Sequence, residues 1–249
     1  MQLLVSVSNA AEARAGVQGG ADIIDAKDPL VGALGAVRPE VMSRIRRAVD
    51  SSRLVTAALG DAEITAGSPK ALETSHEGME QLARELVARG ARLVKVGFAG
   101  LVDPKRVGEI VARMARACAS VNSASGVIAV TYADALAGQG IDCRRLLSIT
   151  AGSGARGVLV DTADKRGAGL LELWSIAALE AWVAEAHSSG LTAAVAGKLR
   201  LDDLAAVAET GADVAGVRGA ACVGGRVGRV SSERVRALAA RVALERSTN

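Results

Sequence analysis

Residues 20–27 read Gly-Ala-Asp-Ile-Ile-Asp-Ala-Lys and contain the pattern that decides the fold. A glycine, which ends a helix by adopting a left-handed conformation, precedes a short apolar run of the kind expected for a strand buried on both faces. The opening triplet of Gly, Ala and a polar residue recurs at residues 90–92, 154–156 and 211–213. Because each copy precedes another apolar run, the four triplets predict four equivalent helix-to-strand junctions.

Around these junctions, short apolar runs alternate with longer amphipathic segments. The predicted strands are Leu3–Ser8, Ala21–Lys27, Leu54–Gly60, Leu93–Phe98, Val127–Tyr132, Gly157–Thr162, Thr192–Ala196 and Val214–Arg218. The predicted helices are Ala10–Gln18, Glu40–Val49, Ser75–Arg89, Lys105–Ala119, Cys143–Ala151, Ser175–Ser188, Leu201–Thr210 and Ser232–Glu245. Eight such units match the (β/α)8 TIM barrel, whereas a doubly wound sheet seldom has eight regular units. We therefore predict an α/β fold with residues 1–249 as a single TIM-barrel domain.

The composition agrees with this fold and limits the kinds of molecule that the protein is expected to bind. Half of the residues are hydrophobic but only 2% are aromatic, so the core must be built from aliphatic side chains, which suit a parallel sheet. The 30 Lys and Arg residues against 27 Asp and Glu leave a net charge of only +3. With so few aromatic rings to stack on bases, no nucleic-acid partner is expected. A small cationic excess fits a pocket for anionic substrates.

Other classes are excluded by what the chain lacks. No apolar stretch reaches the length of a membrane span, and the N-terminus has no signal-peptide pattern, so we expect a cytoplasmic protein without a membrane partner. The cysteines, Cys118, Cys143 and Cys222, are scattered, as is usual in a reducing compartment. The histidines, His76 and His187, lack metal-ligand spacing, so no metal site is predicted.

Five charged residues fall within or soon after the predicted strands. Asp25 and Lys27 end the second strand, Lys95 lies within the fourth, and Asp161 lies in the sixth with Lys165 in the loop after it. Since the active site of a TIM barrel lies at the carboxyl ends of its strands, we expect these side chains to converge. The alternatives are a structural ion pair between Asp25 and Lys27, or lysines that extend to solvent.

A cluster of lysines has a specific chemistry. A lysine amine is a nucleophile only when deprotonated, and its ordinary pKa of about 10.4 is lowered by burial or by a second cation. One member can then form an imine with a carbonyl, while carboxylates position the amines and move protons. We predict Lys27 as a Schiff-base lysine acting on small phosphorylated aldehydes or ketones, assisted by Lys95, Asp161, Lys165 and Asp25.

Two glycine-containing stretches predict a phosphate site. Gly197 and Lys198 follow the seventh strand, and Arg218, Gly219 and Ala220 follow the eighth. The loops after these two strands form the common phosphate site of TIM barrels, where glycines let backbone N–H groups approach the anion.

A second glycine-containing loop, residues 32–36, follows Lys27. A mobile lid, a second anion site and a plain loop all remain open for it.

Taken together, these motifs resemble the (5-formylfuran-3-yl)methyl phosphate synthase family. The matching stretches are residues 3–6, 19–29, 35–36, 95–97, 132–135, 159–163, 196–197 and 216–222. The segment of residues 223–229 and Lys198 depart from the family's pattern.

The resemblance implies a TIM barrel that condenses two glyceraldehyde 3-phosphate molecules into a phosphorylated furan aldehyde, with loss of phosphate and water. It implies that Lys27 forms the Schiff base and that Lys95, Lys165, Asp25 and Asp161 act with it. The product would serve methanofuran or methylofuran biosynthesis, and no cofactor is expected because the protonated imine is the electron sink.

Two other functions remain open at this point. One is a class I aldolase or isomerase acting on a single triose phosphate, and the other is a non-catalytic barrel that binds a phosphorylated metabolite. In each case the expected partner is a small phosphorylated molecule. The Ala-rich helices favour a homo-oligomer, although no face is identified.

Overall fold

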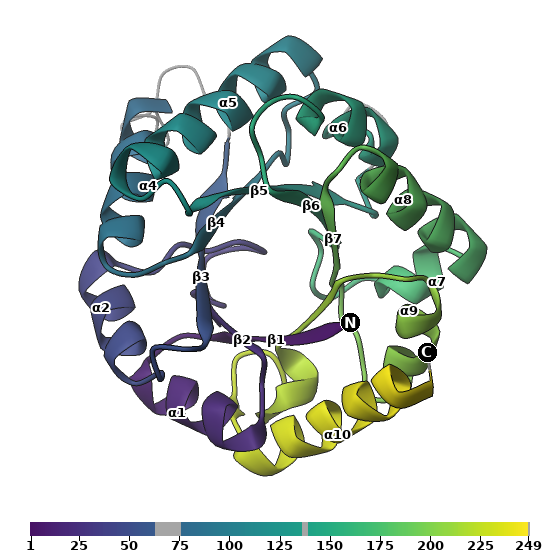
Figure 1. The fold of residues 1–249 in the computed structure, drawn as a ribbon. Coiled ribbons are helices and arrows are strands. Elements are labelled where there is room, and N and C mark those ends of the chain that lie inside the picture. Colours follow the sequence, from purple (N-terminus) through teal and green to yellow (C-terminus); the bar gives the residue numbers. More distant parts are fainter. Residues whose placement is uncertain (63–75, 136–138, 249) are drawn as a thin grey trace.

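The computed structural model describes residues 1–62, 76–135 and 139–248. Eight parallel strands form a closed barrel in the order of the sequence, which confirms the predicted TIM barrel (Figure 1). The strands are β1 (Gln2–Val7), β2 (Ile23–Ala26), β3 (Leu54–Asp61), β4 (Leu93–Gly97), β5 (Gly126–Tyr132), β6 (Gly157–Asp161), β7 (Thr192–Val195) and β8 (Val214–Val217).

Helices surround the barrel on its outer side (Figure 1). They are α1 (Ala10–Gly19), α2 (Pro39–Arg47), α4 (His76–Ala88), α5 (Pro104–Val121), α6 (Cys143–Thr150), α7 (Leu170–Leu173), α8 (Ile176–Ser188), α9 (Asp203–Glu209) and α10 (Ser232–Thr248). The predicted start of the third helix, Ser75, lies outside the described residues. Across the described ranges, no helix is both long and apolar enough to span a bilayer.

Four short elements after β6 and β8 were not predicted. Helix α7 follows β6, and a 3-10 helix, η1 (Gly219–Ala221), follows β8. An antiparallel pair, β9 (Cys222–Val223) and β10 (Arg229–Val230), then precedes α10. All four are too short to leave a periodic pattern in the sequence.

The repeated junctions have a common geometry, as predicted. The four glycines, Gly20, Gly90, Gly154 and Gly211, have φ values of 92°, 99°, 84° and 79°. Two residues later, the backbone N–H donates to a carbonyl of the preceding strand at 2.7 to 2.9 Å: Asp22 to Leu3, Arg92 to Val55, Arg156 to Val127 and Asp213 to Ala193. The repeat therefore marks where each even-numbered strand joins its odd-numbered neighbour.

The two faces of the barrel sheet are packed differently. Side chains that point toward the helices, such as Val5, Val94 and Val195, are completely buried. On the inner face of β7 and β8, small residues such as Ala194 and Gly216 remain partly exposed. Because the interior of a TIM barrel is normally filled by large aliphatic side chains, these small residues leave it hollow.

A cavity of about 490 Å³ occupies this hollow. It extends from the loops at the carboxyl ends of the strands down to the first residues of β2, β4, β7 and β8, which are Ile23, Leu93, Thr192 and Val214. The barrel thus encloses a deep well whose upper wall carries the charged residues.

Candidate active site

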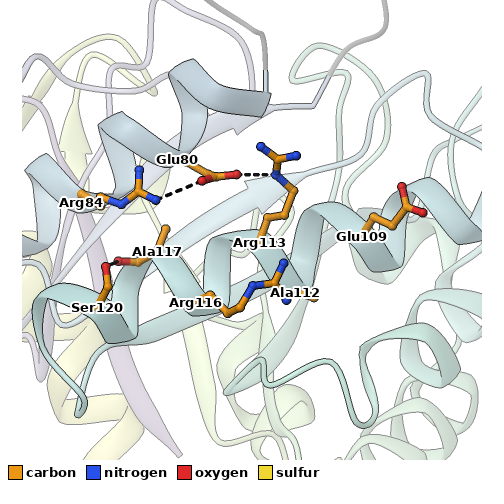
Figure 2. A pocket seen from close by; sticks show the side chains of 8 residues that line it. All are labelled: Glu80, Arg84, Glu109, Ala112, Arg113, Arg116, Ala117 and Ser120. Atoms are coloured by element: carbon orange, nitrogen blue, oxygen red, sulfur yellow. Dashed lines mark hydrogen bonds and ion pairs between the residues drawn. The ribbon is translucent and has the colours of Figure 1, made fainter.

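The described residues contain a second hollow of similar size, on the outside of the barrel. This groove of about 530 Å³ is lined by residues of α4 and α5 (Figure 2). Glu80 lies between Arg84 and Arg113 and pairs with both of them. Since this groove lies between two outer helices, whereas the interior cavity is lined by residues at the carboxyl ends of the strands, the cavity is the better candidate for an active site.

Asp25 is the centre of a buried polar cluster at the upper wall of this cavity. Its Oδ2 accepts a hydrogen bond from Ser6 Oγ at 2.9 Å, and its Oδ1 accepts one from Thr56 Oγ1 at 2.7 Å. Lys95 Nζ lies 2.6 Å from the same Oδ1. Burial would raise the pKa of Asp25, but the charges of Lys95 and Lys27 and the hydrogen bonds from Lys95 and Thr56 lower it overall. The four consecutive strands β1–β4 therefore meet at one carboxylate.

A second carboxylate lies across the cavity on β6. Asp161 Oδ1 is 2.7 Å from Lys165 Nζ and accepts a hydrogen bond from the Thr162 backbone N–H at 2.8 Å. Lys165 also donates to the Thr162 carbonyl. Burial would raise the pKa of Asp161, but the charges of Lys165 and Lys27 and the hydrogen bonds hold it below its usual value.

Lys27 stands between these two ion pairs. It follows β2, and its backbone N–H donates to the Val7 carbonyl at 2.9 Å. The side chain lines the cavity and is 8% exposed. Within the described part of the chain, its amine makes no hydrogen bond or ion pair. Lys27 is therefore the odd cation in a set of three amines and two carboxylates.

The pKa of Lys27 reflects this position. Burial has the largest effect and lowers the pKa. The negative charges of Asp161 and Asp25 raise the pKa, and the positive charges of Lys95 and Lys165 lower it further. The net result is a pKa of about 8. Because this value lies well below the ordinary one, the amine is partly neutral near pH 7 and available as a nucleophile.

The predicted phosphate-site residues gather at the rim of the cavity. Gly197, Lys198, Gly219 and Ala220 all line it. Lys198 is the one non-glycine residue with a positive φ, 61°, in the described ranges, and such strain is common at ligand sites. Its amine donates to the Gly167 carbonyl. Phosphate binding by these residues stays a prediction.

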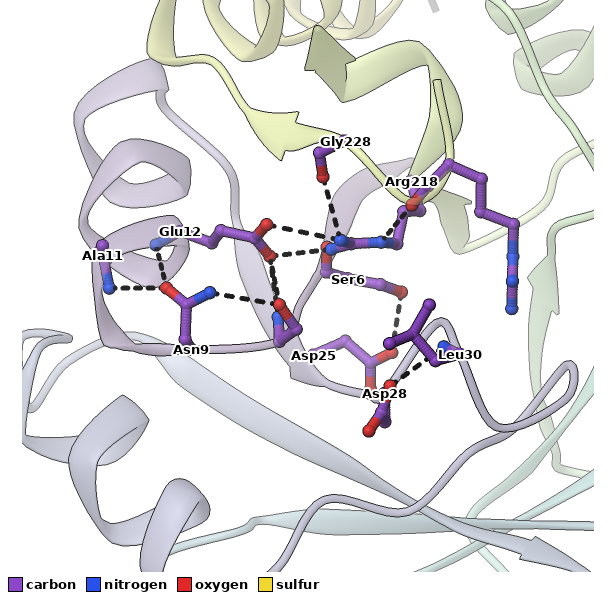
Figure 3. A network of polar contacts seen from close by, with 11 residues as sticks. Ser6, Asn9, Ala11, Glu12, Asp25, Asp28, Leu30, Arg218 and Gly228 are labelled. Atoms are coloured by element: carbon purple, nitrogen blue, oxygen red, sulfur yellow. Dashed lines mark hydrogen bonds and ion pairs between the residues drawn. The ribbon is translucent and has the colours of Figure 1, made fainter. Parts of the chain in front are cut away.

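Arg218 also reaches the rim, but its guanidinium is already engaged. It pairs with Glu12 of α1, with Nη1 2.8 Å from Oε2, and donates to the Ser6 carbonyl at 2.9 Å. It also donates to the Arg226 and Gly228 carbonyls at 2.8 and 3.3 Å. Figure 3 shows Glu12 facing Arg218 while Ser6 reaches Asp25. These contacts give Arg218 a structural role, while a direct contact with phosphate stays a prediction.

The loop of residues 28–35 forms one side of the rim. Its backbone closes on itself, since the Asp28 N–H donates to the Gly35 carbonyl at 2.8 Å. Leu34 is buried and lines the cavity. Arg226 also lines the cavity and donates to two carbonyls of this loop, those of Pro29 and Gly32.

Sequence reasoning missed four residues of this site: Ser6, Thr56, Glu12 and Arg226. Ser6 and Thr56 are ordinary hydroxyl residues within apolar strands. Glu12 follows the helix cap Asn9 by three residues, a spacing that predicts a capping interaction rather than a partner for Arg218. Among the described residues, no group of His, Cys, Asp and Glu side chains is arranged to hold a metal ion.

Solved structures of other proteins share this architecture. The phosphoribosyl anthranilate isomerase from Thermus thermophilus aligns with a TM-score of 0.64 at 15% identity, over 98% of this chain and 99% of that chain. A 3-hexulose-6-phosphate synthase aligns with a TM-score of 0.61 at 23% identity, over 96% and 99% of the two chains. At such low identity, the likeness shows the fold alone.

Sequence comparisons identify the family. The (5-formylfuran-3-yl)methyl phosphate synthase of Methanobrevibacter smithii is 36% identical over 225 residues, covering 90% of this chain and 91% of that protein. Its counterpart in Methanothermobacter thermautotrophicus is 35% identical over 240 residues, covering 96% and 97%. The model of the 4-HFC-P synthase family matches residues 3–239. The chain therefore belongs to the 4-HFC-P synthase family.

Proposed function

We propose that the protein condenses two molecules of glyceraldehyde 3-phosphate into (5-formylfuran-3-yl)methyl phosphate through a Schiff base on Lys27, with release of phosphate and water. The resemblance of the chain to its family adds a use for the product, the biosynthesis of a methanofuran-type or methylofuran-type cofactor. Membership of the family supports the product, and the geometry of the cavity supports the chemistry.

The observation that carries the mechanism is the charge balance around Lys27. Two of the three amines are neutralised by Asp25 and Asp161 at 2.6 and 2.7 Å. The third, that of Lys27, has a pKa of about 8. At pH 7, roughly a tenth of such an amine is unprotonated, which suits imine formation. The cavity also falls within the volume of roughly 300–1,000 Å³ that is usual for small-molecule sites.

The proposed sequence begins at the carbonyl of one triose phosphate. The neutral Lys27 amine attacks the carbonyl carbon, and loss of water leaves a protonated imine. The positive nitrogen withdraws electrons, so the Asp161–Lys165 pair can remove the α-proton and leave an enamine.

The enamine expels the phosphate of this first molecule, which leaves the terminal carbon as an enol nucleophile conjugated to the imine. This carbon attacks the carbonyl carbon of the second molecule, which reacts as its ketone isomer, and the carbon–carbon bond forms. A hydroxyl group of the second molecule closes the ring on C2 of the first, and loss of two waters gives the furan. Hydrolysis of the imine then releases the aldehyde and frees Lys27.

Borohydride trapping tests this proposal directly. The protein is incubated with glyceraldehyde 3-phosphate and borohydride, and the reduced adduct is mapped by mass spectrometry. We expect the adduct on Lys27, and we expect a furan-absorbing product when borohydride is omitted. Lys27→Arg keeps the charge but removes the nucleophile, so it should abolish both.

Other outcomes would redirect the assignment. An adduct on Lys27 without any furan product would favour a class I aldolase or isomerase acting on one triose phosphate. If no lysine is modified, the imine mechanism fails, and a barrel that only binds a phosphorylated metabolite becomes the better explanation.

A further inference from the structure

Arg226 is a cation at the rim of the cavity that has no role in the mechanism above. Its backbone lies beside Gly219, since a Cβ added to that glycine would come within 3.9 Å of the Arg226 nitrogen. Its side chain extends away from β7 and β8 to the loop of residues 28–35, where it donates to the Pro29 and Gly32 carbonyls. The guanidinium therefore lies on the β2 side of the rim.

The charge of Arg226 is not neutralised by a direct partner in the described part of the chain. Within the described residues, no carboxylate lies within ion-pair distance of its guanidinium, and its two hydrogen-bond acceptors are neutral carbonyls. The neighbouring Arg218, by contrast, is paired with Glu12. Burial lowers the pKa of Arg226, with Asp161, Arg218 and Asp28 as further influences. A half-buried cation of this kind is costly unless an anion joins it.

The unused donors of Arg226 fit a phosphate group. A guanidinium has five N–H donors, and two of them are engaged by the loop carbonyls. The others remain for an anion, and the planar fork of arginine matches two phosphate oxygens at once. Because Arg226 lines the cavity, a phosphate bound there would belong to a molecule inside the active site.

We propose that Arg226 binds the phosphate of the second substrate molecule, at a subsite between the β9–β10 segment and the loop of residues 28–35. This inference rests on the proposed condensation, which places two phosphorylated molecules in one cavity. The first phosphate would occupy the rim formed by Gly197, Lys198, Gly219 and Ala220. Of the three possibilities for the loop after Lys27, the second anion site is thus the one that the structure favours.

Calorimetric titration with inorganic phosphate tests the subsite without any turnover. Arg226→Met should remove one binding equivalent or weaken phosphate binding by about tenfold or more, as expected for loss of a charge-assisted contact. Arg229→Met is the matched control, because Arg229 is an exposed arginine of the same segment, and it should bind phosphate as the parent protein does. Unchanged phosphate binding in Arg226→Met would overturn the proposal.

A second variant separates anion binding from a purely structural tether. Arg226→Lys keeps the positive charge but cannot hold both loop carbonyls with a fork. Partial retention of phosphate binding in this variant supports the subsite. Equal loss in Arg226→Lys and Arg226→Met would assign Arg226 to holding the loop and overturn the proposal.

Kinetics then connect the subsite to the reaction. In Arg226→Met, trapping of the first molecule on Lys27 should persist, while furan formation should need about tenfold more substrate. If no furan forms even in the parent protein, the proposed function fails, yet the phosphate titration still decides the subsite. Furan formation with an unchanged substrate requirement in Arg226→Met would contradict the subsite alone.

Discussion

The barrel contains two lysine–aspartate pairs that look alike but are built differently. Asp25 and Lys95 join β2 to β4 at 2.6 Å, and their side chains are 0% and 6% exposed. Asp161 and Lys165 meet at 2.7 Å, but here the amine comes from the loop after β6 and is 16% exposed. The first pair is a buried ion pair between two strands. The second pair contains a partly exposed lysine that comes from a loop and lines the cavity.

The difference in exposure suggests that one lysine–aspartate pair is structural and that the other transfers protons. Asp25 also accepts hydrogen bonds from Ser6 and Thr56, so its oxygens are engaged and it is suited to hold strands together. Lys165 is held by Asp161 and one carbonyl, and it is the more accessible amine. We therefore propose that the Asp161–Lys165 pair transfers protons and that the Asp25–Lys95 pair has a framework role.

The largest expected effect is a difference in catalytic activity between variants of the two lysines, Lys165 and Lys95. Lys165→Met should slow exchange of the substrate α-proton by about 10²–10⁴-fold, the usual contribution of a general acid or base, while trapping on Lys27 persists. Deuterium uptake from heavy water measures the exchange. Lys95→Met is the matched variant and should retain far more exchange; equal loss in both would remove the distinction between the pairs.

Asp25→Asn tests the framework role through stability. It leaves the buried Lys95 cation without a carboxylate, so the free energy of unfolding should fall by about 3–5 kcal/mol. Asp161→Asn should cost clearly less, because Lys165 can turn toward water. Denaturant unfolding of both variants measures the difference, and a larger loss in Asp161→Asn would reverse the assignment.

Lys27→Met tests whether the charged form of Lys27 destabilises the folded protein. Its pKa of about 8 lies below the value of about 10.4 in an unfolded chain. Between these values the unfolded chain binds more protons, so the parent protein gains stability as pH rises. The variant should therefore be more stable by up to about 3 kcal/mol at pH 7, with a gap that closes by about pH 10.4. A gap that stays constant with pH would contradict this account.

The smallest expected effect concerns the pH dependence of imine formation. Trapping on Lys27 should rise with pH through a midpoint near the pKa of about 8, because only the neutral amine attacks. Asp161→Asn should move this midpoint lower, since the charge of Asp161 raises the pKa of Lys27. Asp25→Asn should move it less, because Asp25 has the smaller influence. The opposite order would show that Lys27 belongs with the other pair.

The sequence predicted the barrel because its information is local. Apolar runs and junction glycines such as Gly20 and Gly90 specify each unit separately, and eight units suffice to close a barrel. The charged cluster was also predictable, since Lys95 and Asp161 stand out within apolar strands.

The rim was harder to predict because its contacts join distant segments. Arg218 and Glu12 are 206 residues apart, and Arg226 and Pro29 are 197 apart. No spacing along the chain relates such partners. Arg218 therefore seemed free to bind an anion, whereas the structure shows its guanidinium paired with Glu12. Among the residues that the structure describes, Arg226 is the one of these two arginines that has no carboxylate within ion-pair distance.

The hollow interior has a consequence for how such an enzyme can diversify. Its depth depends on small inner residues such as Ala194, Ala196 and Gly216; a Cβ at Gly216 would already come within 3.3 Å of Ala196. Larger side chains there would fill the well and recover packing energy that the barrel now forgoes. A single larger apolar side chain at one of these positions would thus shorten the substrate that fits and raise thermal stability. Every charged group around Lys27 would stay in place. The core side chains would then set the length of the molecule that fits into the cavity.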